Sequence, residues 1–146
     1  MVWNIEKDIP GVEMNGLNTD KPGTIGHVNR ATNSTTSTVT LTAAQVALGY
    51  IYNTAGTVTM TLPTGTLLGN YVGAQRGTTL ELYVDNTAST TGPVTVAVAT
   101  NGVLSDAAAT TSASFGQLTV AAGTTGIGRF TIMFASGTAY VFTRTA

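Results

Sequence analysis

Beyond residue 38 the sequence alternates apolar and polar residues with a period of two, and this pattern constrains the fold more than any other feature. The alternation recurs in six segments: 37–42, 56–63, 78–86, 93–99, 129–135 and 138–145. Successive side chains of a strand point to opposite faces, so alternation that includes β-branched residues predicts half-buried β-strands. We also expect strands in 48–53, 102–106 and 115–120.

The segments between the expected strands contain turn residues. Gly, Pro, Asn and Asp gather at 53–56, 62–65, 85–93 and 135–138. Seven or eight short strands separated by such turns predict an all-β domain, and we favour a jelly-roll-like β-sandwich over an immunoglobulin-like one. At 41–47, Thr42 and Gln45 form a capping-box pattern that predicts a helix of one or two turns. A second short helix or a loop is expected at 66–73.

The first 30 residues lack this alternation. They contain seven of the thirteen charged residues, two prolines, and apolar residues that recur singly without helical or strand period. Such a segment cannot offset its ordering entropy by burying its own surface, so we predict an extended N-terminal arm that docks on a partner. An ordinary disordered terminus and an arm lying on its own domain remain alternatives. The expected docking residues are Trp3, Ile5, Ile9, Val12, Met14 and Leu17.

The domain boundaries follow from these changes of pattern. Residues 31–38, ATNSTTST, are small and polar and are predicted to form a hinge. The chain is therefore expected to consist of an arm at 1–30, a hinge at 31–38 and a β domain at 39–146.

Charged residues make up only 9% of the chain, against about 25% in an ordinary soluble domain. A free monomer would have little colloidal protection, which predicts that other subunits cover part of the surface. The alternative is a neutral surface solvated by hydroxyl groups, because threonine occupies 30 positions. The formal net charge of -1 gives no electrostatic reason to expect nucleic acid or a membrane as a partner. Candidate residues of a subunit interface are Tyr50, Tyr52, Tyr71, Tyr83, Arg76 and Arg129.

A search for catalytic chemistry finds little. The one histidine, His27, lies in the predicted arm, which is a poor place for a rigidly held triad. Glu81 and Asp85 share a strand face but lie about 13 Å apart, farther than the carboxyl pair of a glycosidase. The chain has no cysteine, so it has neither a disulfide nor a thiolate metal site. We predict a protein that is not an enzyme and has no metal site and no cofactor.

Four motifs follow one another between residues 38 and 146. They are TLTAAQ at 40–45, a strand ending in TLPT at 61–64, a strand ending in VDNT at 84–87, and an FTIMF-turn-YVFTR hairpin at 130–144. In this order they resemble the decoration (cement) proteins of tailed-bacteriophage heads. The resemblance implies a β-sandwich or jelly roll, commonly a homotrimer, that binds the major capsid protein on the outer surface of the virion. The start of the chain has no signal-peptide pattern, so we expect synthesis in the host cytoplasm.

A phage fibre-tip or carbohydrate-binding β module is the alternative function. The tyrosines at 50, 52, 71 and 83 would then form a surface on which sugar rings stack. Aromatic residues of small β domains more often fill core or interface positions, which favours the structural role.

Overall fold

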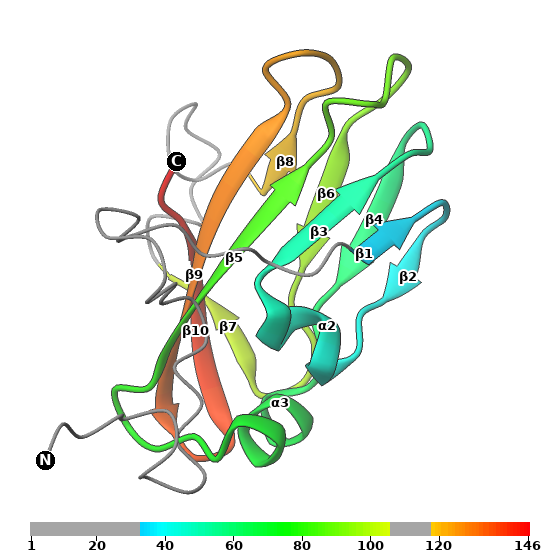
Figure 1. Ribbon diagram of the computed structural model, residues 1–146. Coiled ribbons are helices and arrows are strands. Elements are labelled where there is room, and N and C mark those ends of the chain that lie inside the picture. Colours follow the sequence, from blue (N-terminus) through cyan, green and yellow to red (C-terminus); the bar gives the residue numbers. More distant parts are fainter. Residues whose placement is uncertain (1–32, 106–117) are drawn as a thin grey trace, which may run out of the picture. The chain divides into compact units, whose positions relative to one another are not determined.

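The computed structural model describes residues 33–105 and 118–146, which form two β-sheets and two short helices (Figure 1). Buried side chains from both sheets belong to one hydrophobic cluster, so the two sheets enclose a shared core. The all-β prediction is therefore confirmed at the level of a β-rich, two-sheet fold. The predicted arm at 1–30 lies outside the described residues.

The elements are named in chain order. The six-stranded sheet contains β1 (Asn33–Thr35), β3 (Tyr50–Asn53), β5 (Thr79–Asp85), β9 (Ile127–Ser136), β10 (Ala139–Arg144) and β7 (Gly102–Leu104), in that spatial order. The four-stranded sheet contains β2 (Val39–Thr40), β4 (Val58–Thr61), β6 (Val94–Ala97) and β8 (Thr119–Val120). The helices are α2 (Ala43–Leu48), between β2 and β3, and α3 (Gly65–Val72), between β4 and β5.

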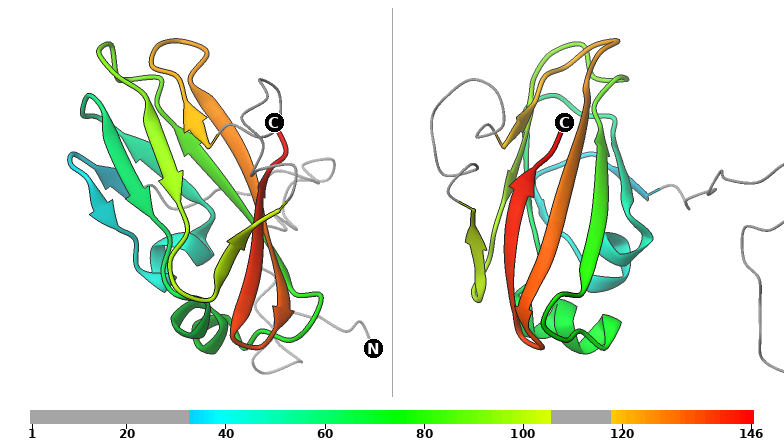
Figure 2. Two further views of the ribbon diagram at one scale, coloured as in Figure 1. Left: turned by 180° about the vertical axis from the view of Figure 1, so that it is seen from behind. Right: turned by 90° about the vertical axis from the view of Figure 1, so that its left-hand side faces the viewer.

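The chain passes from one sheet to the other at each step from β1 to β9, as the views of Figure 2 show. Strands β1, β3 and β5 pair in parallel in one sheet, and β2, β4 and β6 pair in parallel in the other. One strand from each sheet thus makes a rung, and three rungs stack as in a short parallel solenoid. Antiparallel pairing adds β9 and β10 to the first sheet and β8 to the second, and parallel pairing of β7 with β10 completes the six-stranded sheet.

The predicted jelly-roll-like arrangement is not confirmed. A jelly roll is built from antiparallel strands, whereas five of the eight strand pairings among the described residues are parallel. Period-two alternation shows that a strand is half buried, but it does not show the direction of the neighbouring strand. The described ranges also contain ten strands, where seven or eight were predicted, and β1 is the strand that lies outside every segment predicted as a strand.

The predicted hinge at 31–38 contains part of the first rung. Strand β1 pairs with β3 in parallel, and Thr35 lies opposite Asn53. The Thr38 hydroxyl accepts a hydrogen bond of 3.1 Å from the Thr59 N–H on β4. The polar sequence concealed this strand because its position is set by pairing with β3 rather than by an apolar face of its own.

The alternating apolar residues form the core on the predicted parity. Those with at most 3% of their surface exposed include Val58, Met60, Leu82, Val84, Val94, Val96, Phe130, Ile132 and Phe134. In the closing hairpin, the Phe130 and Phe142 rings stack with centroids 5.1 Å apart, and Phe134 meets Tyr140 edge to face at 5.9 Å. The hairpin therefore supplies the aromatic part of the core.

Both expected helices are present, and each begins at a threonine. The Thr42 hydroxyl accepts from the Gln45 N–H at 3.2 Å, and the Gln45 side chain accepts from the Thr42 N–H at 2.9 Å, so the predicted capping box is confirmed. Thr64 caps α3 in the same way, with Leu67 as the donor. Gly49 ends α2 with a φ of 75°, a left-handed conformation that favours glycine.

Two fully buried asparagines connect the rungs at one turn. Asn53 ends β3 and Asn86 follows β5, and the Asn53 amide donates to Asn86 Oδ1 at 2.7 Å. The Asn86 amide donates in turn to the carbonyl oxygens of Gly92 and Val120, each at 3.1 Å. Because Val120 belongs to β8, this chain of hydrogen bonds connects neighbouring rungs and also the two sheets.

We predict that Asn86→Ala lowers the free energy of unfolding by about 2–4 kcal/mol. The substitution removes three buried hydrogen bonds, one from the Asn53 amide and two to the carbonyl groups of Gly92 and Val120. Urea denaturation monitored by circular dichroism measures the change. Asn70→Ala, at an exposed position of α3, is the matched control and should cost less than about 0.5 kcal/mol. Equal effects of the two substitutions would contradict a structural role for the asparagine pair.

Candidate functional site

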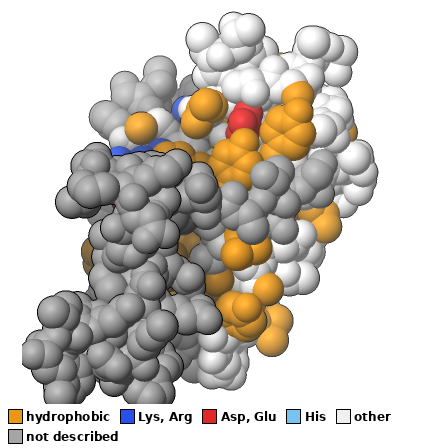
Figure 3. All heavy atoms as spheres, viewed as in Figure 1, with side chains coloured by type: hydrophobic (Ala, Val, Ile, Leu, Met, Phe, Trp, Pro, Cys, Tyr) orange, Lys and Arg blue, Asp and Glu red, His pale blue; other side chains and the backbone are white. Residues whose placement is uncertain are grey.

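The outer face of the six-stranded sheet is the candidate functional site. We define this outer face by the side chains of β3, β5 and β9 that alternate with the core residues. They are Tyr50, Tyr52, Glu81, Tyr83, Asp85, Ile127, Arg129, Thr131 and Met133. Figure 3 shows hydrophobic side chains gathered next to an acidic group on this side of the molecule.

The strand register brings together four of the six predicted interface residues. Tyr50 lies opposite Tyr83 on β5, and Tyr83 lies opposite Arg129 on β9. The guanidinium carbon of Arg129 is 5.9 Å from the centre of the Tyr83 ring, within the range of a cation–π interaction. Tyr52 lies opposite Asp85, on the same face as Tyr50. These residues form one aromatic and charged group across three strands.

The other two predicted interface residues lie elsewhere. Tyr71 is on α3 with 60% of its surface exposed, and Arg76 is exposed in the connection between α3 and β5. The six candidates therefore do not all lie on one sheet face, and their role at a subunit interface stays a prediction. Tyr71 and Leu67, four residues apart on α3, instead form a small exposed apolar pair.

A short hydrogen bond joins Tyr50 to Asp85. The Tyr50 hydroxyl donates to Asp85 Oδ2 at 2.6 Å, while the N–H and the hydroxyl of Thr87 donate to Oδ1 at 2.9 and 2.7 Å. Burial disfavours the Asp85 carboxylate and is the largest single effect, but these hydrogen bonds together outweigh it and lower the pKa of Asp85. The hydrogen bond to Asp85, followed by burial, raises the pKa of Tyr50 to about 12.

Glu81 and Arg129 form an ion pair on the same face. Their hydrogen bond raises the pKa of the Arg129 guanidinium above its usual value. Both side chains are well exposed, so the pair adds little stability. Its effect is to fix Arg129 beside Tyr83 and to compensate one of the two carboxylates of the outer face.

Apolar side chains extend this face beyond the tyrosines. Ile127 and Met133 are 55% and 51% exposed on β9, and Val103 is 57% exposed on β7. Met133 lies opposite Val141, which in turn lies opposite Val103, so three apolar residues follow one another across β9, β10 and β7. Exposed apolar side chains that adjoin one another in this way are typical of protein–protein contacts.

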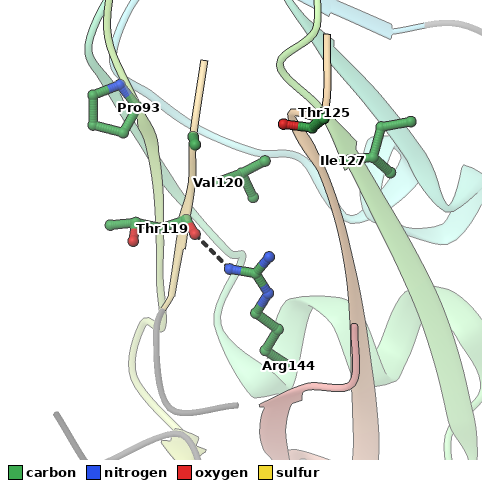
Figure 4. A pocket seen from close by; sticks show the side chains of 7 residues that line it. Pro93, Thr119, Val120, Thr125, Ile127 and Arg144 are labelled. Atoms are coloured by element: carbon green, nitrogen blue, oxygen red, sulfur yellow. Dashed lines mark hydrogen bonds between the residues drawn. The ribbon is translucent and has the colours of Figure 1, made fainter. Parts of the chain in front are cut away.

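A pocket of about 260 Å³ lies between β8 and the ends of β9 and β10 (Figure 4). It is lined by Pro93, Thr119, Val120, Ala121, Thr125, Ile127 and Arg144. Arg144 spans it, because its Nη1 donates to the Thr119 carbonyl at 2.6 Å while its Nε donates to the Ala146 carbonyl at 3.0 Å. Arg144 therefore connects β10 to β8, and its guanidinium lies 5.9 Å from the Phe130 ring centre. No residue of the lining is a carboxylate or a histidine.

Two further searches cover the described part of the chain. Residues 33–105 and 118–146 contain no group of three or more His, Asp or Glu side chains placed to hold a metal ion. No helix in these ranges has the length and apolar character needed to cross a membrane.

The remaining predicted site residues lie outside the described residues. They are the arm residues Trp3, Ile5, Ile9, Val12, Met14 and Leu17. Their proposed roles stay predictions.

The sequence analysis did not identify Asn53, Asn86 and Arg144, whose hydrogen bonds hold together the strands that form the outer face and the pocket. Asn53 and Asn86 each follow a strand and each begin an Asn-Thr-Ala triplet, at 53–55 and 86–88. A triplet repeated at the ends of two strands indicates equivalent turns of stacked rungs. Arg144 had no such signal, since only the fold brings it to β8.

Comparison with protein-family models, with curated proteins and with solved structures gave no match to this chain. The functional argument therefore rests on its own residues.

We predict that Tyr50→Phe lowers the free energy of unfolding by about 1 kcal/mol at neutral pH, a usual value for one hydrogen bond. The lowered pKa of Asp85 means that its contribution is complete above the unfolded value of 3.8 and is lost as the pH falls through the folded value. The raised pKa of Tyr50 means that its contribution is complete below pH 10.0 and is lost as the pH rises to about 12. The difference between wild type and variant should therefore be constant between these limits and shrink outside them.

Denaturant titrations at several pH values measure this profile. Tyr52→Phe is the matched control on the same strand and face, since the described residues give its hydroxyl no hydrogen bond. A Tyr50→Phe effect that did not shrink at any pH below 3.8 down to acid unfolding would contradict the assignment to the Asp85 carboxylate.

Proposed function

We propose that this chain is a non-catalytic structural protein of a virus particle, a decoration (cement) protein that binds the outer surface of a tailed-phage head. It would contact the major capsid protein and stabilise the shell by bridging capsid subunits. The order of motifs from TLTAAQ to YVFTR supports this proposal. The jelly-roll part of the resemblance does not, because most strand pairings among the described residues are parallel.

The single observation that carries the proposal is the apolar surface of the outer face. Ile127 and Met133 are more than half exposed on a rigid sheet, and Glu81 and Arg129 neutralise one another between them. A sheet face with apolar side chains, an ion pair between Glu81 and Arg129, and an Asp85 carboxylate already hydrogen-bonded by Tyr50 and Thr87 can be covered by a protein partner at a small desolvation cost. Such a surface suits attachment to a capsid better than turnover of a small substrate.

The free energy of burying apolar surface is large enough to hold neighbouring capsid subunits together. Burial of about 800 Å² of apolar surface in each copy would give a gross gain of about 20 kcal/mol before the costs of association. Repeated over a shell, a small fraction of this gain stabilises the assembly. The arm at 1–30 belongs to the same proposal. The resemblance implies a homotrimer, but the role of the outer face does not depend on the number of copies.

The test is co-sedimentation of the full chain with undecorated phage heads. We predict that Met133→Lys weakens binding by at least about tenfold, because the partner would have to bury an unpaired ammonium group. Leu67→Lys, a matched change at a 62% exposed position of α3, should bind as wild type does. No co-sedimentation of the wild-type protein would count against the function itself, and equal effects of the two variants would count against the outer face.

A carbohydrate-binding module is the second candidate, and one observation favours it. Tyr50, Tyr52 and Tyr83 share a face with two carboxylates and an arginine, and sugar-binding surfaces combine aromatic rings with such polar groups. In this case a neutral glycan would stack on the rings and donate hydroxyl groups to Asp85 or Glu81.

Glycan-array binding separates the two candidates. If the chain binds sugars, Tyr52→Ala should abolish glycan binding, whereas Tyr71→Ala, on α3, should leave it unchanged. Capsid attachment with no glycan signal excludes this second function.

A further inference from the structure

Among the described residues, the outer edges of the first rung have no neighbouring strand, at the same end of both sheets. We name this the first-rung face and define it as β1, β2 and the turn between them, residues 33–40. Strand β1 is the edge of the six-stranded sheet and β2 is the edge of the four-stranded sheet. Two edge strands from successive positions in the chain therefore lie at the same end of the domain (Figure 1).

Neither edge strand has the features that usually prevent strand addition. Natural edge strands are protected by lysine, proline, bulges or inward charges. Strands β1 and β2 contain none of these residues, and the sequence has no Asp, Glu, Lys, Arg or His from residue 31 to residue 75. The first rung thus offers backbone hydrogen-bonding groups without electrostatic protection.

The backbone of β2 leaves hydrogen-bonding groups on the open side. The Leu41 N–H donates to the Thr61 carbonyl at 2.8 Å, so this side of the backbone faces β4. Backbone groups of successive strand residues point to opposite edges, which turns the N–H and C=O of Thr40 away from β4. The side chain of Thr40 is also exposed.

The opposite edge of the four-stranded sheet, β8, has a charged side chain bonded to its backbone. Strand β8 pairs with β6 through the Leu118 carbonyl, which accepts from the Val96 N–H at 2.9 Å. The next carbonyl, that of Thr119, is bonded by Arg144 at 2.6 Å. A cation therefore occupies the carbonyl edge of β8, whereas the first rung has no charged residue.

A buried hydroxyl at the first rung lacks a partner. Thr35 is only 6% exposed, and its Oγ1 makes no hydrogen bond among the described residues. Thr35 is in register with Asn53, whose amide bonds to Asn86 of the third rung. The row of buried polar side chains therefore ends at the first-rung face with an unused donor and acceptor. Buried polar groups are rarely left without a hydrogen bond, and a group supplied from outside the described residues would satisfy this one.

We propose that the first-rung face is an interface between two copies of this chain. Two such faces related by a twofold axis would pair β1 with β1 and β2 with β2 of the second copy, antiparallel in each case, and continue both sheets across the dimer. The backbone groups of Thr40 gain partners, and the Thr35 hydroxyl gains polar neighbours from the second β1.

A second copy suits this face because the face is uncharged. Identical faces related by a twofold axis bring like groups together, so any exposed charge near the axis would repel its own copy. The first rung has no charge to repel, and one symmetry operation covers both open edges. This inference does not depend on the proposed capsid function.

Light scattering of the full chain at tens of micromolar tests the interface. We expect a dimer for the wild type and for Thr124→Lys, a matched change in the exposed turn between β8 and β9. Thr40→Lys and Thr40→Glu should each weaken association at least about tenfold, because like charges then meet across the axis. An equimolar mixture of these two variants should restore the dimer, which unfolding or unspecific aggregation would not do.

Thr35→Val adds a milder change inside the face. Loss of the hydroxyl should weaken association by about threefold to tenfold without a change in the circular dichroism spectrum. A wild-type monomer, a trimer, or a dimer that Thr40→Lys leaves intact would each overturn the inference. A trimer would do so while leaving head binding to be decided by co-sedimentation, so the two proposals fail separately.

Discussion

The hydrogen bond between the buried amides of Asn53 and Asn86 fixes how one rung lies on the next. Parallel neighbours are joined by long connections and not by tight hairpins, so turn geometry alone does not set their register. A buried amide must find its partners, and a slip by one residue would leave both asparagines unpaired and turn every core residue outward. The alternation of tyrosines and core residues on β3 and β5 depends on this register.

The outer face follows directly from that register. Tyr50 lies opposite Tyr83, and Tyr52 lies opposite Asp85. The Tyr50 hydroxyl therefore reaches diagonally to the Asp85 carboxylate on the neighbouring strand. Arg129 joins the group from the antiparallel strand β9. The face is therefore built on strands whose opposite side is fully buried, which makes it rigid. A rigid, partly apolar surface loses little entropy when a large partner covers it.

The sequence predicted the elements better than their arrangement. Period-two alternation located core residues such as Met60 and Phe130, and the Thr42 capping box located α2, because both are local effects. Parallel pairing was not predictable in this way, since a half-buried strand has the same pattern beside either kind of neighbour. Strand β1 was missed because pairing with β3 creates it. For the site, the tyrosines were selected by residue type, and only the fold shows that those of β3 and β5 lie together while Tyr71 lies on α3.

The scarcity of charge has a location as well as a magnitude. Within the described ranges the first two rungs have no charged residue. The charged residues of these ranges lie just before β5, on β5, on β9 and on β10, from Arg76 to Arg144. In a stacked fold each rung is covered by its neighbours, and the terminal rung needs a polar cap to remain soluble alone. The uncharged rungs here include the terminal one, whose Thr35 hydroxyl is buried and unbonded among the described residues. Residues 76–146 are also poor in charge, with six charged residues in 71, but at the first rung the absence of charge is complete. An exposed polar edge without charge is suited to pairing with an equally uncharged edge.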